Sequence, residues 1–241
     1  VGDQQWLRCG LQEDGLVMIL TIHHVLYDGW SLGTLLNDLF DCYDGISITK
    51  SIPFKRVVEY IESQDQEATR EYWTHYLEGV EADNGLFGNQ SVSNTDSSPI
   101  KQVIDVDMNQ LKLAASKSKV TLATLTKAAW ALTLRTYSQK NKIVFGNVVS
   151  GRDLPVEGIE GVIGMLINTI PFKIDIEPSQ SLKEFLDQVQ QHQIDSLPYC
   201  QTDLIDIQKW VGIQGQDKLF NSTSVYENLP EQHMTLEHKY E

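Results

Sequence analysis

The hydrophobic pattern begins with two short apolar segments separated by a turn signal. The segments QWLRCGL (5–11) and LVMILTI (16–22) are rich in residues that favour strands. Between them stands the pair Asp14-Gly15, which suits a tight turn because both residues tolerate the backbone angles that such a turn requires. Residues 5–22 are therefore expected to form a β-hairpin.

The pattern then changes to the spacing of an amphipathic helix. Apolar residues recur every three or four positions over residues 32–43, with Ser31 placed to cap the amino end and Gly45 to end the helix. A second helical region follows over residues 53–77 and opens on a proline. Its polar middle, ESQDQEATR, predicts a break or a solvated bend.

Strand and helix patterns mix in the second half of the chain. Dense valine and isoleucine make residues 142–150 the best candidate for a central strand, and Ser181 and Glu184 form a capping box. The expected elements are strands at 100–108, 142–150, 164–176 and 217–229, and helices at 109–119, 121–138 and 181–197. Such mixing in both halves predicts an α/β (α+β) fold.

Residues 82–99 interrupt this order with glycine, asparagine and serine, a composition that favours turns over packed elements. They contain the best linker candidate in the chain. The glycine-spaced segment GIEGVIG (158–164) is loosely similar to a phosphate-binding loop, but it precedes an expected strand and does not open a helix. We therefore interpret it as a turn.

Composition narrows the class of protein. The 241 residues carry a net charge of −14 from 19 basic and 33 acidic side chains, which argues against nucleic-acid binding. The three cysteines are far apart and odd in number, which argues against a disulfide framework and favours a cytoplasmic protein. The longest apolar run, residues 16–22, is too short to span a membrane, and no signal peptide is visible. Because the chain opens on Val1 inside an expected strand, we expect a fragment of a longer protein.

The stretch HHVLYDGWS (23–31) contains several side chains that can take part in catalysis or in ligand binding. Metal binding is unfavourable, since adjacent strand side chains point to opposite faces and no third nitrogen or sulfur ligand lies near in the sequence. Both histidines can instead be hydrogen-bonded core residues. The Asp-Gly loop and the helix after it favour another interpretation, in which an anchored loop fixes a histidine well enough for proton transfer.

The same stretch resembles the His-His-x-x-x-Asp-Gly motif of condensation domains from nonribosomal peptide synthetases, members of a chloramphenicol acetyltransferase-like superfamily. Three later segments resemble further blocks of that family in the same order. They are SGRDLPVEGIEGVIGMLINTIP (150–171), HQIDSLPYCQTDL (192–204) and DKLFNSTSVYEN (217–228). In the second of these, residues 195–197 interrupt the family pattern.

The resemblance implies a two-lobed, chloramphenicol acetyltransferase-like sandwich with a cleft between the lobes, present here in part. Residues 1–85 are expected to end the N-terminal lobe, 86–98 to form the linker and 99–241 to supply most of the C-terminal lobe. Family members carry a further stretch before the histidines. The resemblance implies that this stretch supplies an arginine that pairs with the motif aspartate, so we expect Asp28 to lack its arginine partner in this chain.

The resemblance also implies the reaction. The amine of one carrier-bound aminoacyl thioester attacks the acyl thioester of another, and an amide forms. Because a thioester is already activated, no enzyme nucleophile is needed, and no nucleophile motif such as G-x-S-x-G is present. Positioning, proton handling and oxyanion stabilisation remain for the protein to supply.

His24 matches the second motif histidine and is the expected catalytic residue, acting as a base or as a positioner of the amine. Asn168 either faces the cleft or satisfies backbone groups at a strand edge. The other expected site residues are His23, Asp28 and Gly29 as structural support, and Trp30 and Ser31 as cleft contacts.

No cofactor is expected to bind directly, because the substrates would arrive on the phosphopantetheine arms of carrier domains. Peptidyl carrier domains and the adjacent adenylation domain of the same synthetase are the expected partners. Three rival functions stay open: a coenzyme A-dependent acyltransferase of the same superfamily, an epimerisation domain, and an inert or carrier-docking fragment. The Asp-Phe-Gly-Trp-Gly motif of the plant acyltransferases is absent from the sequence, which counts against that branch.

Overall fold

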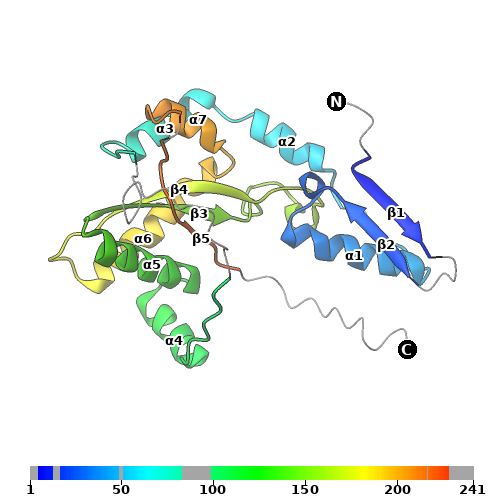
Figure 1. Ribbon diagram of the computed structural model, residues 1–241, viewed down its shortest axis with the longest axis horizontal. Coiled ribbons are helices and arrows are strands. Elements are labelled where there is room, and N and C mark those ends of the chain that lie inside the picture. Colours follow the sequence, from blue (N-terminus) through cyan, green and yellow to red (C-terminus); the bar gives the residue numbers. More distant parts are fainter. Residues whose placement is uncertain (1–4, 13–16, 49–50, 83–98, 216, 228–241) are drawn as a thin grey trace. The chain divides into compact units, whose positions relative to one another are not determined.

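The computed structural model describes residues 5–12, 17–48, 51–82, 99–215 and 217–227 (Figure 1). The chain divides into two compact units. Unit 1 comprises Val1–Gln64, Ser150–Ile167 and Glu227–Glu241, and unit 2 comprises Asp65–Val149 and Asn168–Tyr226. The expected linker at 86–98 lies outside the described residues, and the lobe assignment built on it stays a prediction.

Unit 1 begins with the hairpin predicted from the sequence. Strands β1 (Leu7–Leu11) and β2 (Met18–Ile22) pair antiparallel, which confirms the predicted strand pairing. The turn predicted at Asp14-Gly15 lies outside the described residues. The 3-10 helix η1 (His24–Leu26) follows β2 directly and leads into helix α1 (Gly29–Tyr43). The histidine pair therefore lies at the junction between a strand and a helix.

The beginning of α1 corrects one expectation. The N-cap is Asp28, whose side chain accepts from the backbone N–H of Ser31, while the Ser31 hydroxyl accepts from the backbone N–H of Asp28. Ser31 was expected at the cap but stands three residues into this reciprocal capping box. Either residue type can cap a helix, and the reciprocal bonds place the earlier one at the boundary.

Among its described residues, unit 1 also contains a second α-helix and a long return segment. Helix α2 (Phe54–Glu62) ends before the polar break, and helix α3 (Gln66–Tyr76) begins unit 2, so the predicted interruption is confirmed. The return segment, Ser150–Ile167, contains the 3-10 helix η2 (Ile159–Gly161). Gly158 before η2 has a φ of +79°, which glycine adopts readily, and this confirms the turn predicted there.

Unit 2 is built around a three-stranded sheet in the order β4-β3-β5. The central strand β3 (Lys142–Val149) pairs antiparallel along its whole length with β4 (Asn168–Asp175) and parallel with the short β5 (Thr223–Ser224). The central position predicted for residues 142–150 is therefore confirmed.

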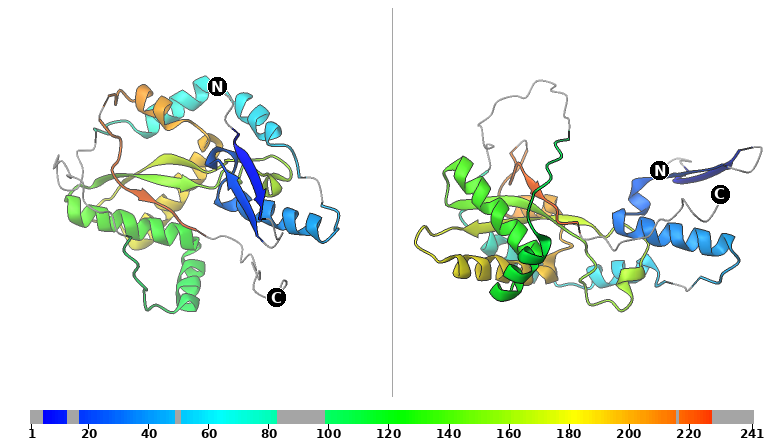
Figure 2. Two further views of the ribbon diagram at one scale, coloured as in Figure 1. Left: turned by 45° about the vertical axis from the view of Figure 1, so that its right-hand side comes forward. Right: turned by 90° about the horizontal axis from the view of Figure 1, so that it is seen from below.

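Helices cover both faces of this sheet, as Figures 1 and 2 show. Helices α5 (Leu122–Ser138) and α6 (Leu182–Ser196) lie on one side, and α3 and α7 (Leu204–Trp210) lie on the other. In the described part of unit 2, the other helices are α4 (Met108–Ser118) and the 3-10 helix η3 (Leu197–Tyr199). The capping box at Ser181 and Glu184 is present, as predicted. The mixed α/β class is therefore confirmed.

The core of unit 2 lies between the sheet and the α5–α6 pair. Phe145 of β3 and Phe172 of β4 are both buried, with ring centroids 5.2 Å apart. Burying side chains of this size contributes about 1.5–3 kcal/mol each. The other members of the buried cluster are Val120, Ala128, Ala131, Leu134, Ile143, Ile174, Ile176, Phe185, Leu186 and Val189.

Two strand predictions in the second half were wrong. Residues 100–107 alternate like a strand but form irregular backbone, and helix α4 begins at Met108. Of the strand expected at 217–229, only Thr223–Ser224 of β5 pairs among the described residues. Alternation identifies a segment that suits a sheet, but a strand also needs a neighbouring strand to complete its hydrogen bonds.

Gly146 provides a test of the β3–β5 contact. A Cβ at this position would lie 2.6 Å from Cε2 of Phe220 and 2.7 Å from Cγ2 of Thr223. We expect Gly146→Ala to lower the free energy of unfolding by about 1–3 kcal/mol, because both side chains must move. Gly10→Ala on β1 is the matched control, since its Cβ would meet nothing within 4 Å. Equal effects of the two substitutions in urea titrations would contradict this packing.

Candidate active site

The first histidine of the motif is held by its surroundings. The backbone N–H of His23 donates to the carbonyl of Trp6, with 2.8 Å between nitrogen and oxygen. Its Nδ1 accepts from the backbone N–H of Val25 at 3.2 Å, and its ring meets the Trp6 ring edge-on at 4.5 Å between centroids. Because Nδ1 is an acceptor here, His23 serves as the N-cap of η1. This bonding supports the structural role expected for His23, which stays a prediction.

The second histidine is presented differently. His24 is exposed, and its imidazole lies nearly parallel to the ring of Tyr27, with centroids 4.7 Å apart and an angle of 21° between the ring planes. The backbone N–H of Tyr27 also donates to the carbonyl of His24 at 3.4 Å. His24 therefore combines a fixed backbone with a solvent-accessible imidazole, the combination that proton transfer to a substrate requires.

The aspartate of the motif is fully buried. Its carboxylate accepts the N–H of Ser31 at 2.8 Å, an N-cap bond that fixes the first turn of α1. The backbone N–H groups of Leu166 and Ile167 donate to its other oxygen at 3.0 and 3.3 Å. Asp28 thus joins the start of α1 to a segment nearly 140 residues further along the chain.

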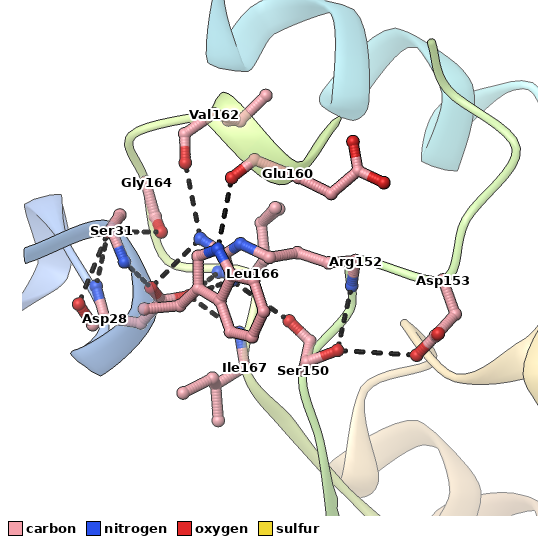
Figure 3. Close-up of polar contacts among 11 residues, drawn as sticks. Asp28, Ser31, Ser150, Arg152, Asp153, Glu160, Val162, Gly164, Leu166 and Ile167 are labelled. Carbon is pink, nitrogen blue, oxygen red and sulfur yellow. Dashed lines mark hydrogen bonds and ion pairs between the residues drawn. The ribbon is translucent and has the colours of Figure 1, made fainter. Parts of the chain in front are cut away.

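A buried arginine completes this arrangement (Figure 3). Nη1 of Arg152 lies 2.8 Å from one carboxylate oxygen of Asp28, and Nη2 lies 3.0 Å from the other. The same two nitrogens donate to the carbonyls of Ser150 and Val162 at 3.3 Å. Side-chain exposure is 3% for Arg152 and 0% for Asp28, so the pair is bidentate and shielded from water.

This pair corrects the expectation that Asp28 lacks an arginine partner. Arg152 stands in the segment SGRDLP, within the first of the three later blocks that resemble the family, but no local pattern links it to an aspartate 124 residues earlier. A physical argument, and not a sequence pattern, indicates that Asp28 needs such a partner. A buried carboxylate needs a cation or several donors, and Asp28 has both.

Trp30 and Ser31 strengthen the link between the motif and the return segment. The indole N–H of Trp30 donates to the carbonyl of Glu160 at 3.1 Å, and its ring lies 5.5 Å from the guanidinium carbon of Arg152. The Ser31 hydroxyl reaches the carbonyl of Gly164 at 3.3 Å. The contacts recorded for these two side chains therefore lie within unit 1, and the expected cleft contacts stay predictions.

Gly29 and Asn168 were the remaining expected site residues. Gly29 opens α1 and faces open space, since a Cβ there would meet nothing within 4 Å. In unit 2, the Asn168 amide donates to the carbonyls of Cys200 and Thr202, both at 2.9 Å, and its oxygen accepts from the N–H of Thr169. This bonding favours the structural alternative for Asn168, and the contact with substrate stays a prediction.

The surroundings of Asp28 shift its ionisation. Burial alone would raise the pKa of the carboxyl. The hydrogen bonds from Arg152, Ser31 and Leu166 and the positive charge of Arg152 outweigh burial and hold the pKa below its ordinary value of 3.8. Asp28 therefore stays ionised in the folded chain under acidic conditions in which an unfolded aspartate takes up a proton.

This shift predicts a pH-dependent free energy of unfolding. Because the folded pKa lies below the unfolded value of about 3.9, the contribution of Asp28 is complete above about pH 5 and is lost as the pH falls through the folded pKa. Urea titrations from pH 7 to pH 3 should show this loss, and Asp28→Asn should reduce it. A carbon-13 NMR titration of the Asp28 carboxyl should give a midpoint below 3.8. A midpoint at or above that value would contradict the prediction.

The described residues contain no group of three or more histidine, cysteine, aspartate or glutamate side chains arranged to hold a metal ion. Within the same residues, no helix has the length and apolar character needed to cross a membrane.

Fold and site together define a mixed α/β protein whose candidate active site is a histidine pair placed before a buried, arginine-paired aspartate. The chain belongs to the condensation-domain family, since the family model matches residues 7–241. This match confirms the resemblance found in the sequence motifs.

Relatives with curated names are similar along most of this chain. Chondramide synthase cmdD of Chondromyces crocatus is 34% identical over 222 residues, covering 88% of this chain and 6% of the relative. Bacitracin synthase 3 of Bacillus licheniformis is 30% identical over 238 residues, covering 95% of this chain and 4% of the relative. The chain thus spans a small part of the length of these synthases.

Solved structures support the fold. The four-domain nonribosomal peptide synthetase AB3403, in its holo form with AMP and glycine bound, matches 89% of this chain with a TM-score of 0.71 and 21% identity. The first condensation domain of the calcium-dependent antibiotic synthetase, in complex with a substrate analogue, matches 86% with a TM-score of 0.64 and 18% identity. The matched regions cover 17% and 49% of those two chains.

Proposed function

We propose that this chain forms amide bonds between carrier-bound aminoacyl or peptidyl thioesters in nonribosomal peptide synthesis, with His24 at the reacting centre. The observation that carries the proposal is the exposed His24 imidazole, four residues before an aspartate that is buried against an arginine. Membership of the condensation-domain family supports the class of reaction.

The chemistry requires little beyond these groups. The nitrogen of the acceptor amine attacks the thioester carbon of the donor, the carbon–sulfur bond breaks, and the carrier thiol leaves as the amide forms. An α-amino group has a pKa of about 8, so roughly a tenth is neutral at pH 7. His24 accepts the proton that the amine loses, or hydrogen-bonds to the amine and orients it.

Substrates and partners follow from the same proposal. Both acyl groups would be held on phosphopantetheine arms of peptidyl carrier domains, with an adenylation domain of the same synthetase loading one of them. The similar four-domain nonribosomal peptide synthetase AB3403 supports this, because it combines several domains and was solved with AMP and glycine bound. We also propose a cytoplasmic location, which the three dispersed cysteines favour, and no cofactor bound directly to the chain.

The experiment is an amide-formation assay on the full-length protein. Donor and acceptor thioesters are loaded on carrier domains, and the product is followed by intact-protein mass spectrometry. Amide formation that depends on both loaded carriers supports the proposal. Transfer from a free coenzyme A thioester at an equal rate would favour the rival acyltransferase. Absence of both activities would favour the inert or carrier-docking fragment and overturn the proposal.

A further inference from the structure

The loop from His23 to Asp28 is fixed at both ends. At one end the N–H of His23 bonds to the carbonyl of Trp6, and Nδ1 of His23 accepts from Val25. At the other end the Asp28 carboxylate is held by Arg152 and by the backbone N–H groups of α1 and the return segment. The backbone of the intervening residues, including His24, therefore has little freedom to move.

Within the described part of the chain, hydrogen bonds hold the backbone of this loop but not the His24 side chain. Among the residues that the structure describes, the contact recorded for its imidazole is the nearly parallel stack on the ring of Tyr27. Tyr27 is half-buried and stands next to the anchored Asp28, so its ring is better fixed than the exposed imidazole that lies on it. The faces of the two rings are in contact, and stacking leaves the edge of the imidazole, which carries both nitrogens, accessible.

We propose that Tyr27 is a positioning residue, which holds the His24 imidazole in one orientation by ring stacking. The proposal rests on the proposed function for its effect on rate, but the stacking itself is independent of that function. An exposed imidazole rotates about two side-chain torsions, and a displacement of about 1 Å at a reacting group can cost 10²-fold in rate. Because stacking restricts the ring plane, it raises the fraction of time that a ring nitrogen faces the amine.

The proposal is specific to the aromatic ring of Tyr27. If the ring is what matters, phenylalanine replaces tyrosine, because it retains the stacked face and loses only the hydroxyl. If the hydroxyl donates a proton or a hydrogen bond to substrate, phenylalanine fails as alanine does. If Tyr27 only fills space, alanine lowers the free energy of unfolding but leaves the rate per folded molecule unchanged.

The first experiment measures orientation without activity. In this 241-residue chain, the imidazole carbon-bound protons of His24 are assigned by the NMR signals that disappear in His24→Gln. A proton above a stacked ring is shifted upfield, so we expect upfield signals in the unsubstituted protein and in Tyr27→Phe. These signals should move downfield in Tyr27→Ala. Unchanged His24 shifts in Tyr27→Ala would overturn the proposal.

The second experiment measures rate in the full-length protein. Loss of a stacking pair corresponds to about a 3- to 10-fold change, so Tyr27→Ala should lower kcat by that factor with KM changed less than about twofold. Tyr27→Phe should stay within about twofold of the parent. Tyr137→Ala is the matched control, since Tyr137 is an exposed tyrosine on α5. Equal losses in Tyr27→Phe and Tyr27→Ala, or a parental kcat in Tyr27→Ala, would overturn the proposal. If the unsubstituted protein forms no amide, the proposed function fails and the NMR shifts alone decide the orientation of His24.

Discussion

Replacing His24 with alanine is expected to slow amide formation by about 10²–10⁴-fold, the usual contribution of a positioned acid or base. The fold should survive, because the imidazole is exposed and the backbone around it is held by His23 and Asp28. The measurement is single-turnover amide formation in the full-length protein, together with thermal unfolding. The matched control is His75→Ala, since His75 is an exposed histidine on α3. A His24→Ala protein with parental turnover would remove His24 from the reacting centre.

The pH dependence of this loss tests whether His24 deprotonates the acceptor amine before attack. A base is needed most when the acceptor amine is protonated, and an α-amino group has a pKa of about 8. If His24 takes the proton from the ammonium form before attack, the deficit of His24→Ala should shrink as the pH rises from 7 to 9, because the amine becomes neutral without help. If His24 orients the amine, or accepts the proton that the neutral amine loses as the amide forms, the deficit should stay constant over that range. Rate against pH for both proteins decides between deprotonation before attack and these later roles.

Local sequence patterns predicted the elements that position the histidines. The Asp14-Gly15 turn signal predicted the pairing of β1 with β2, and the apolar spacing after it predicted α1. Both predictions succeeded because each pattern involves residues that are close together in the chain. The sequence pattern did not fix the residue at which α1 begins. Asp28 and Ser31 are both good caps, and only the observed reciprocal bonds show that the helix begins after Asp28.

Contacts between residues far apart in the chain could not be predicted from local sequence patterns. The chain has five arginines, and the sequence pattern of Arg152 does not distinguish it as the partner of Asp28. The segment 100–107 illustrates the opposite error, because its alternating pattern is that of a strand while its backbone is irregular. In both cases the outcome depends on which distant segment packs alongside, and single-sequence periodicity carries no information on that.

The burial of Asp28 against Arg152 leads to the other large expected effect. Removing one member of a buried ion pair leaves the other charge without compensation and costs about 3–5 kcal/mol. We expect Arg152→Ala to lower the free energy of unfolding by that amount in urea titrations of the folded chain. It should also lower activity, because the Asp28 carboxylate anchors the end of the loop that carries His24.

A double substitution separates the cost of an unpaired charge from the value of the pair itself. Asp28→Asn combined with Arg152→Met leaves neither charge buried, so it should recover part of the free energy lost in Arg152→Ala. The exposed pair between Lys183 and Asp187 on α6 provides the control, since breaking such a pair by Lys183→Ala should cost at most about 1 kcal/mol. If Arg152→Ala lowers the free energy of unfolding no more than Lys183→Ala does, the Asp28–Arg152 pair is not the anchor of this site. The return segment must then be held to α1 by the hydrogen bonds from its backbone N–H groups to Asp28 and by the hydrogen bond from Trp30 to Glu160.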